Sequence, residues 1–170
     1  LNIIRSHFEI YGLSIDNCYS DAFDADFCTG SLRQSNFRYT GNDCIDFSGS
    51  QVEISDIDIL HSGDKGVSGG EDSQLTLENI KIYGAITGIA SKDKSIVKAH
   101  QVTIEEVEYA LMAFQKKAEY GPATLELSAV NFDWEKDDWI LGKGSTITAN
   151  GESRTGNEVV DVDALYARFE

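Results

Sequence analysis

Five segments of this chain repeat one pattern at intervals of 22 residues, and this periodicity limits the possible folds more than any other feature. The segments begin at Asp21, Asp43, Lys65, Thr87 and Tyr109. In each of them the first residue is followed by a small residue and then by an apolar one. A fixed period of about 20 to 50 residues is typical of a solenoid, in which every repeat packs only on its neighbours.

Short runs of alternating apolar and polar residues lie between these segments, for example at 52–54 and 57–59. Such alternation predicts strands with one buried face. Three short strands in each 22-residue repeat favour a right-handed parallel β-helix, because left-handed β-helices use hexapeptides and a shorter coil. We therefore predict an all-β solenoid of about six to seven coils with three strands in each coil.

Stacked coils place equivalent residues about 4.8 Å apart, so the repeat also predicts columns of like side chains. One inward column is predicted to contain Phe23, Ile45, Val67, Ile89 and Leu111. A polar row in the turn between the second and third strands is predicted to contain Asn36, Asp56, Asn79 and Gln101. We expect this row to form hydrogen bonds from coil to coil.

The pattern indicates a single domain over residues 1–170, with coils over about 1–148 and a C-terminal cap over about 149–170. The repeat slips after Phe114, and residues 115–122 are predicted to form a loop. A solenoid end exposes unpaired strand edges, so a cap is expected there. The candidates are Trp134, Trp139 and the tail, in which 163–169 has the pattern of a short amphipathic helix.

The charge of the chain narrows the classes of partner. It has 14 Lys and Arg against 29 Asp and Glu, a net charge of −15. Such a surface repels nucleic acid and anionic membranes, and it suits cations such as Ca²⁺, whose ligands are carboxylate oxygens. We find no apolar run long enough to span a membrane. The 3 cysteines do not form a disulfide framework.

The outward residues of the second and third strands are predicted to alternate in charge. The second-strand row is predicted to contain Glu9, Arg33, Glu53, Thr76 and Lys98. The third-strand row is predicted to contain Ser14, Arg38, Asp58, Lys81 and Thr103. Opposite charges on neighbouring strands stabilise a sheet, so both surfaces are expected to be paired internally and solvated.

The first strand differs, because its outward residues concentrate negative charge. One row is predicted to contain Asp24, Asp46, Ser68, Ala90 and Met112, and the next Asp26, Ser48, Gly70, Lys92 and Phe114. Three interpretations remain open. The carboxylates can be solvated turn and surface groups. They can bind Ca²⁺, with Asp24, Asp26 and Asp46 as the ligands. They can line an active cleft with a proton-transfer group of shifted pKa.

The repeats resemble the coils of bacterial right-handed parallel β-helix proteins of the pectate-lyase-like superfold. The segments that carry the resemblance are 20–24, 41–50, 63–68 and 88–93. They are most similar to β-helix modules that accompany CotH-kinase-like and lamin-tail-like domains, which implies an extracellular or cell-surface location. The superfold includes lyases, epimerases, glycosidases, adhesins and structural modules. The paired-Asp and His-Gly motifs of polygalacturonases and the Arg-Pro-x-x-Arg pattern of pectate lyases are absent from the sequence.

The leading hypothesis is therefore a non-catalytic structural or binding module that presents a carbohydrate- or cation-binding surface on the first strands. The residues expected to bind a ligand are Asp24, Asp46, Lys92 and Phe114. The alternative is a polysaccharide lyase or C5-epimerase acting on an anionic polysaccharide. Its catalytic residues would be Asp43, Asp46, Lys65 and Lys92. Open strand edges also favour association of copies end to end or edge to edge.

Overall fold

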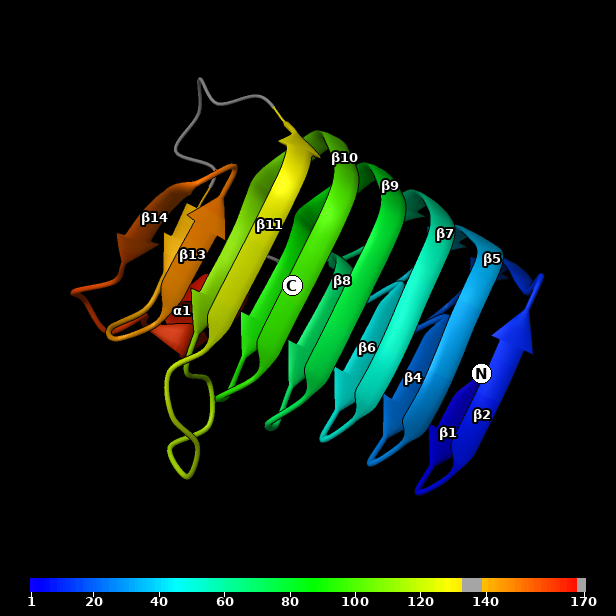
Figure 1. Cartoon of the computed structure of the whole chain (residues 1–170), viewed down its shortest axis with the longest axis horizontal. Helices are drawn as coiled ribbons and strands as arrows, with labels where there is room; N and C mark the ends of the chain where they lie inside the picture. The colour runs from blue at the N-terminus through cyan, green and yellow to red at the C-terminus, as the bar shows by residue number, and fades with distance from the viewer. Residues whose placement is uncertain (133–138, 168–170) are drawn as a thin grey trace.

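The computed structural model describes residues 1–132 and 139–167 and forms a β-solenoid of about six turns (Figure 1). Equivalent strands of successive coils lie side by side along the long axis of the molecule, with the first coil at one end and β13 and β14 near the other. Neighbouring strands are parallel except for the pair β13 and β14. The predicted fold class and the spacing of about 22 residues are confirmed.

The described secondary structure consists almost entirely of strands. The elements are β1 (Asn2–Ile4), β2 (His7–Tyr11), β3 (Ser14–Cys18), β4 (Phe23–Asp26), β5 (Thr29–Thr40), β6 (Ile45–Ser48), β7 (Gln51–Ser62), β8 (Lys65–Gly70), β9 (Gln74–Lys92), β10 (Ile96–Phe114), β11 (Thr124–Asn131), β12 (Trp139–Leu141), β13 (Thr146–Ala149), β14 (Glu152–Thr155) and α1 (Val162–Tyr166). The long strands β5, β7, β9 and β10 continue around corners of the coil, so each contributes to more than one face.

Each coil has three faces around a continuous apolar core. The strand-one face contains β1, β4, β6, β8, the ends of β9 and β10, and β12. The strand-two face contains β2, the first parts of β5, β7, β9, β10 and β11, and β13. The strand-three face contains β3 and the following parts of β5, β7, β9 and β10. The predicted inward column from Phe23 to Leu111 is confirmed by the strand register.

The register of the second coil differs from the prediction by two residues. Ser31, not Arg33, lies opposite Glu9, and Asn36, not Arg38, lies opposite Ser14. The causes are Gly30 in the second strand and Ser35 in the third, which take inward positions that Val52 and Ile57 hold in the next coil. Because these two residues interrupt the alternation, the apolar pattern of each strand starts two residues late in the sequence.

A row of left-handed residues forms the corner between the second and third strands. It consists of Gly12, Gln34, Asp56, Asn79, Gln101 and Ala129, all with positive φ. The predicted polar row is thus correct for its last three members, but Gln34 replaces Asn36. Asn79 donates a hydrogen bond from its side chain to Asp56 Oδ1 at 2.7 Å, which confirms a bond between coils in this row. Asn and Asp tolerate this backbone region better than most residues.

A buried serine ladder supports the corner between the first and second strands. The hydroxyl oxygens of Ser50, Ser73 and Ser95 accept hydrogen bonds from the backbone N–H of the residue one coil earlier, at 2.8 to 3.0 Å. Ser145 does the same for Ala123 at 2.9 Å. These side chains are buried, and the bonds satisfy donors that would otherwise be costly to remove from water.

The C-terminal segment adds an antiparallel strand and a helix to the solenoid. Strand β14 pairs with β13, and α1 lies against the outward side of the strand-one face, where Leu165 packs on Ala90, Met112 and Phe114. Trp139 lies in β12, in the strand-one position of the last coil, whereas Trp134 is outside the described residues. Within the described ranges, we find no helix with the length and apolar character needed to cross a membrane.

Candidate functional site

The outward residues of the strand-one face contain most of the predicted site residues. One row contains Asn2, Asp24, Asp46, Ser68, Ala90, Met112 and Ile140. The next row contains Ile4, Asp26, Ser48, Gly70, Lys92 and Phe114. The two rows change character along the solenoid, from partly exposed carboxylates in the first coils to buried and mainly apolar side chains in the later ones.

We call the partly exposed part, which contains Asp24, Asp26, Asp46 and Ser48, the open half. Asp24 lies directly opposite Asp46 in the strand register. Partial burial, opposed by a hydrogen bond from Asn2 and reinforced by Asp26 and Asp46, raises the pKa of Asp24. Partial burial and the carboxylates of Glu71 and Asp46 raise the pKa of Asp26. The open half therefore carries negative charge that no nearby cation fully compensates.

The three aspartates predicted to bind Ca²⁺ are neighbours on this face but do not converge on one point. Among the described residues, no group of three His, Cys, Asp or Glu side chains is placed to hold a metal ion. A cation at Asp24 and Asp46 would need further oxygen ligands from water or from a bound molecule, because Ca²⁺ takes about 6 to 8 of them.

We call the remainder, which contains Ser68, Ala90, Met112 and Phe114, the covered half. These four residues are at most 1% exposed. Leu165 of α1 and the chain leading to it pack over Ala90, Met112 and Phe114. Phe114 is therefore oriented outward from the core, as predicted, but its ring is not exposed to a ligand. The reason is that Ala90, Met112 and Phe114 form an apolar patch that the C-terminal helix buries.

Lys65 lies at the border of the two halves and forms the centre of a buried ion cluster. Its ammonium lies 3.2 Å from Asp43 Oδ1 and also forms a short ion pair with Asp64. The Lys65 side chain is 3% exposed and that of Asp43 is 6% exposed. Asp43 Oδ1 also accepts the backbone N–H of Lys65 at 3.0 Å. The strand-one register produces this contact, because the two residues occupy equivalent positions in adjacent coils.

The C-terminal helix covers the ion cluster. The ring of Tyr166 lies 5.0 Å from the Lys65 ammonium and 4.3 Å from that of Lys116, both in cation–π geometry. Burial raises the pKa of Asp43 to about 6, although Lys65 and Lys92 oppose that rise. Burial by itself lowers the pKa of Lys65, but Asp43, Tyr166 and Asp64 raise it overall. Lys65 therefore remains an ammonium at neutral pH.

The structure brings together all four residues of the enzyme hypothesis. Asp43 and Lys65 are in contact, while Asp46 and Lys92 are close enough to influence the pKa of Asp43. Lys92 is 7% exposed, and its Cε lies over Gly70. Three buried oxygen atoms near this cluster have no hydrogen-bond partner within the described residues. They are Asp46 Oδ1, Asp64 Oδ1 and Ser68 Oγ.

Sequence reasoning missed two members of the cluster, Asp64 and Tyr166. Asp64 lies in the turn before β8, outside the strand alternation, and Tyr166 belongs to the tail, which has no repeat register to place it. One signal for a covering segment was available, since Ala90, Met112 and Phe114 are apolar residues at outward positions. Such a row indicates that another part of a protein lies over it.

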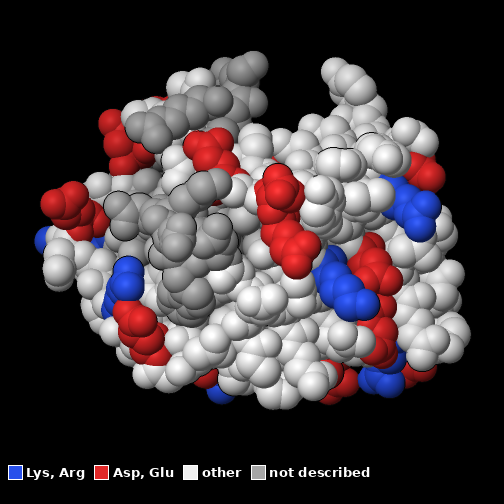
Figure 2. Space-filling view, turned by 90° about the horizontal axis from the view of Figure 1, so that it is seen from above, with Lys and Arg blue, Asp and Glu red and all other residues white. Residues whose placement is uncertain are grey.

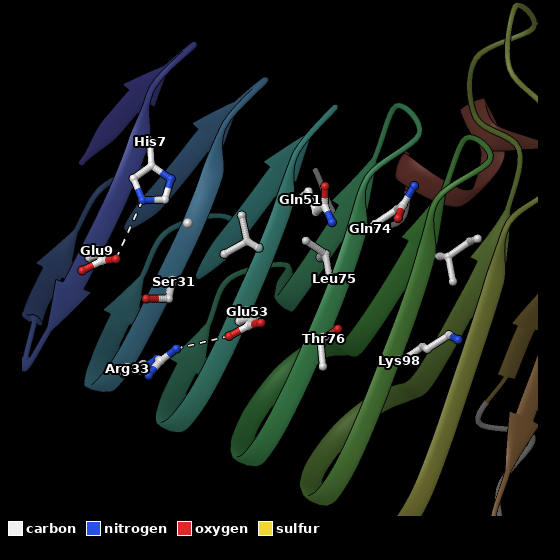
Figure 3. A pocket seen from close by; sticks show the side chains of 13 residues that line it. His7, Glu9, Ser31, Arg33, Gln51, Glu53, Gln74, Leu75, Thr76 and Lys98 are labelled. Carbon is white, nitrogen blue, oxygen red and sulfur yellow. Dashed lines mark hydrogen bonds and ion pairs between the residues drawn. The ribbon is translucent and has the colours of Figure 1, made fainter.

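The strand-two face has a shallow hollow of about 530 Å³, shown in Figure 3. Its Lys and Arg side chains have acidic partners: Arg33 lies 3.2 Å from Glu53, and Lys98 lies 3.7 Å from Glu126, which is outside the hollow. The ring of His7 lies 3.8 Å from Glu9. In Figure 2, the upper side of the solenoid likewise shows basic side chains beside acidic ones. The prediction that these outer surfaces balance their own charge agrees with these pairs, although Arg33 and Arg38 occupy other register positions.

A larger hollow of about 940 Å³ lies at the corner between the third and first strands. We call it the corner groove and define it by Tyr19, Ser20, Tyr39, Asn42, His61 and Glu106, over a floor that includes Gly41 and Gly63. The sequence pattern did not indicate this groove, because its residues lie at the ends of the third strands and in the corners that follow them, and they show no charge pattern.

Comparison with known proteins agrees with the observed architecture. The family described as "Right handed beta helix region" matches residues 4–158. No curated protein and no solved structure matches the chain significantly. The family match covers most of the chain and includes the coils that carry the strand-one face, so the chain belongs to the right-handed β-helix family.

Proposed function

We propose that this chain is a non-catalytic binding module built on a β-solenoid. The observation that supports this most directly is the buried ion cluster. Lys65 is paired with both Asp43 and Asp64, and the ring of Tyr166 lies over it. A proton-transfer group must come within hydrogen-bond reach of its substrate, and these groups instead bond to one another beneath α1.

The alternative is a lyase or C5-epimerase on an anionic polysaccharide, and one observation favours it. Asp43 has a pKa of about 6 and lies beside a lysine, and titratable groups with shifted pKa values are frequent at active sites. Structural ion clusters shift pKa values in the same way, however. In addition, α1 covers this cluster, whereas an active site needs an open cleft that admits the substrate.

Binding and turnover can be separated in one experiment. The full chain is run by affinity electrophoresis through gels containing neutral or uronate polysaccharides, and the same polysaccharides are assayed for new reducing ends, unsaturated products and C5 inversion, with and without millimolar Ca²⁺. We expect retardation by at least one polysaccharide and no product. Product that disappears in Asp43→Asn would establish the enzyme instead. If none of the tested polysaccharides binds, the binding role is overturned.

We further propose that the open half takes a cation when a ligand supplies the missing oxygens. Support comes from the adjacent carboxylates of Asp24 and Asp46, which lack a basic partner within the described residues. Thermal melts with and without millimolar Ca²⁺, repeated with a bound uronate polymer, test this. A ligand at 100 times its Kd adds about 2.7 kcal/mol of stability. The shift should disappear in Asp46→Ala and persist in Asp58→Ala, whose exposed carboxylate lies on the strand-three face. No shift in the wild type would overturn the cation proposal.

A further inference from the structure

We propose that the corner groove binds a neutral polysaccharide chain that lies along the solenoid axis. This inference rests on the proposed binding function and names its site and ligand class. The groove collects residues from the third-strand corners of successive coils, from Tyr19 in the first to Glu106 in the fifth. Its direction follows the stacking of the coils, so it suits an extended polymer better than a compact molecule.

Glycines give the groove a floor without side chains. A Cβ on Gly41 would lie 2.0 Å from the carbonyl oxygen of Tyr19, and one on Gly63 would lie 2.4 Å from that of Gly41. The close approach of successive coils therefore requires glycine at both positions. The result is a glycine strip, formed by Gly41 and Gly63, that lies beside a row of rings and exposes backbone to the groove.

The wall of the groove carries an exposed row of aromatic rings. Tyr39 and His61 stack at 5.3 Å, and His61 meets Tyr83 edge-on at 5.9 Å just beyond the lining. Tyr19 is 98% exposed, Tyr39 is 50% exposed and Tyr83 is 44% exposed. Within the described part of the chain, their hydroxyl groups make no hydrogen bond. Rings with a polar tip fit sugars, whose C–H groups pack on the ring and whose hydroxyls bond to its tip.

Charge separates this groove from the other hollows. Its described lining includes one carboxylate, that of Glu106, and no Lys or Arg. The strand-two hollow, by contrast, contains Arg33 and Lys98 as well as acidic groups. A polyanion would meet Glu106 without a compensating cation, and the net charge of −15 adds to that repulsion. Uncharged hydroxyl-rich chains avoid this cost, which favours a neutral polysaccharide.

The polar base of the groove is already fixed in place. The hydroxyl oxygen of Ser62 lies 2.9 Å from the carbonyl oxygen of Asn42 and 2.7 Å from that of Lys65, so its hydrogen can be donated to either of them. The Asn42 side chain donates to Asp21 Oδ1 at 2.7 Å. Because these bonds exist before any ligand arrives, Ser62 and the Asn42 side chain need no reordering on binding, and preorganisation of this kind favours affinity.

Isothermal titration with neutral oligosaccharides of glucan, xylan and mannan type tests the proposal, with oligogalacturonate as the charged comparison. Tyr19→Ala and Tyr39→Ala are the groove variants. Tyr11→Ala is the matched control, because Tyr11 is 72% exposed and lies outside the groove. We expect a neutral oligosaccharide to bind and each groove variant to weaken binding about tenfold, with no effect of Tyr11→Ala. Tyr19 is so exposed that its truncation should leave the melting temperature unchanged.

The failures of the two proposals are distinguishable. Polysaccharide binding that survives Tyr19→Ala combined with Tyr39→Ala but is lost in Asp46→Ala would keep the binding function and overturn the corner groove as its site. Binding of oligogalacturonate alone would overturn the neutral ligand class. No binding of any saccharide by the wild type would overturn both the inference and the proposed function.

Discussion

Asp24 and Met112 occupy the same outward row of the strand-one face, yet one is partly exposed and the other is 1% exposed. The backbone is equivalent at the two positions, so the fold does not cause the difference. The cause is the row itself, which changes from Asp24 and Asp46 to Ala90 and Met112, and the helix α1, which packs on the apolar end. A side chain that points outward from a β-solenoid can therefore still be buried, and the exposure of each part of a face has to be examined separately.

The border between the two halves concentrates the unusual chemistry. Lys65 pairs there with Asp43 and Asp64, and Tyr166 of the cover contacts its ammonium. The carboxylates of the open half are partly exposed to water, whereas the charged groups at the border are buried and paired with one another. The following predictions test whether the cover and the pairing, and not the coil itself, make the halves different.

Replacing Lys65 should have the largest effect. Lys65→Met removes the cation and leaves the carboxylates of Asp43 and Asp64 buried without it, and breaking a buried pair in this way costs about 3 to 5 kcal/mol of unfolding free energy. Chemical denaturation followed by circular dichroism measures the loss. Lys81→Met, at an exposed ion pair with Asp58, is the control and should cost less than about 1 kcal/mol. Equal effects of the two substitutions would show that the cluster is not energetically special.

Loosening the cover should have the next largest effect. Leu165→Ala removes the buried contact of α1 with Met112, and we expect a loss of about 2 kcal/mol. Met112 is the only methionine of the chain, so its oxidation by peroxide can be followed by mass spectrometry. The rate should rise in Leu165→Ala and stay at the wild-type value in Val159→Ala, where the side chain is 81% exposed. Fast oxidation in the wild type would contradict the covered half.

The last prediction concerns pH. The pKa of Asp43 is raised from 3.8 to about 6 in the folded protein, so the folded state binds a proton that the unfolded state has lost between these values. Its contribution to stability is therefore fully present below about pH 4 and is lost as the pH rises to about 6. Asp43→Asn should remove this decline from the pH dependence of the unfolding free energy. Asp58→Asn should retain it, and an unchanged slope in Asp43→Asn would contradict the assignment.

The sequence predicted the solenoid well because a repeat provides many copies of the same information. The column from Phe23 to Leu111 follows from the period alone. The predicted register of the second coil was wrong because Gly30 and Ser35 break the alternation in this one copy. Single deviations of this kind are decided by the neighbouring coils, whose pairing fixes the strand when its own pattern is incomplete.

The candidate site was predictable only where it follows the repeat. The contact of Asp43 with Lys65 is implied by their equivalent positions in adjacent coils. The segment that buries Phe114 was not predictable, because the position of the tail is set by no repeat, although the apolar row itself indicated that some segment covers it. The corner groove was also missed, since its rings and its glycines come from different coils and become neighbours only in the folded chain.

The serine ladder also implies an order in which the coils are completed during synthesis. The hydroxyls of Ser50, Ser73 and Ser95 each serve a backbone donor one coil earlier in the chain. During synthesis from the N-terminus, a coil therefore emerges before the side chain that completes its corner. The corners at Cys28, Ser50, Ser73 and Ala123 are therefore completed only after about 22 more residues have been made. A nascent chain of this kind would always have one unfinished coil at its growing end.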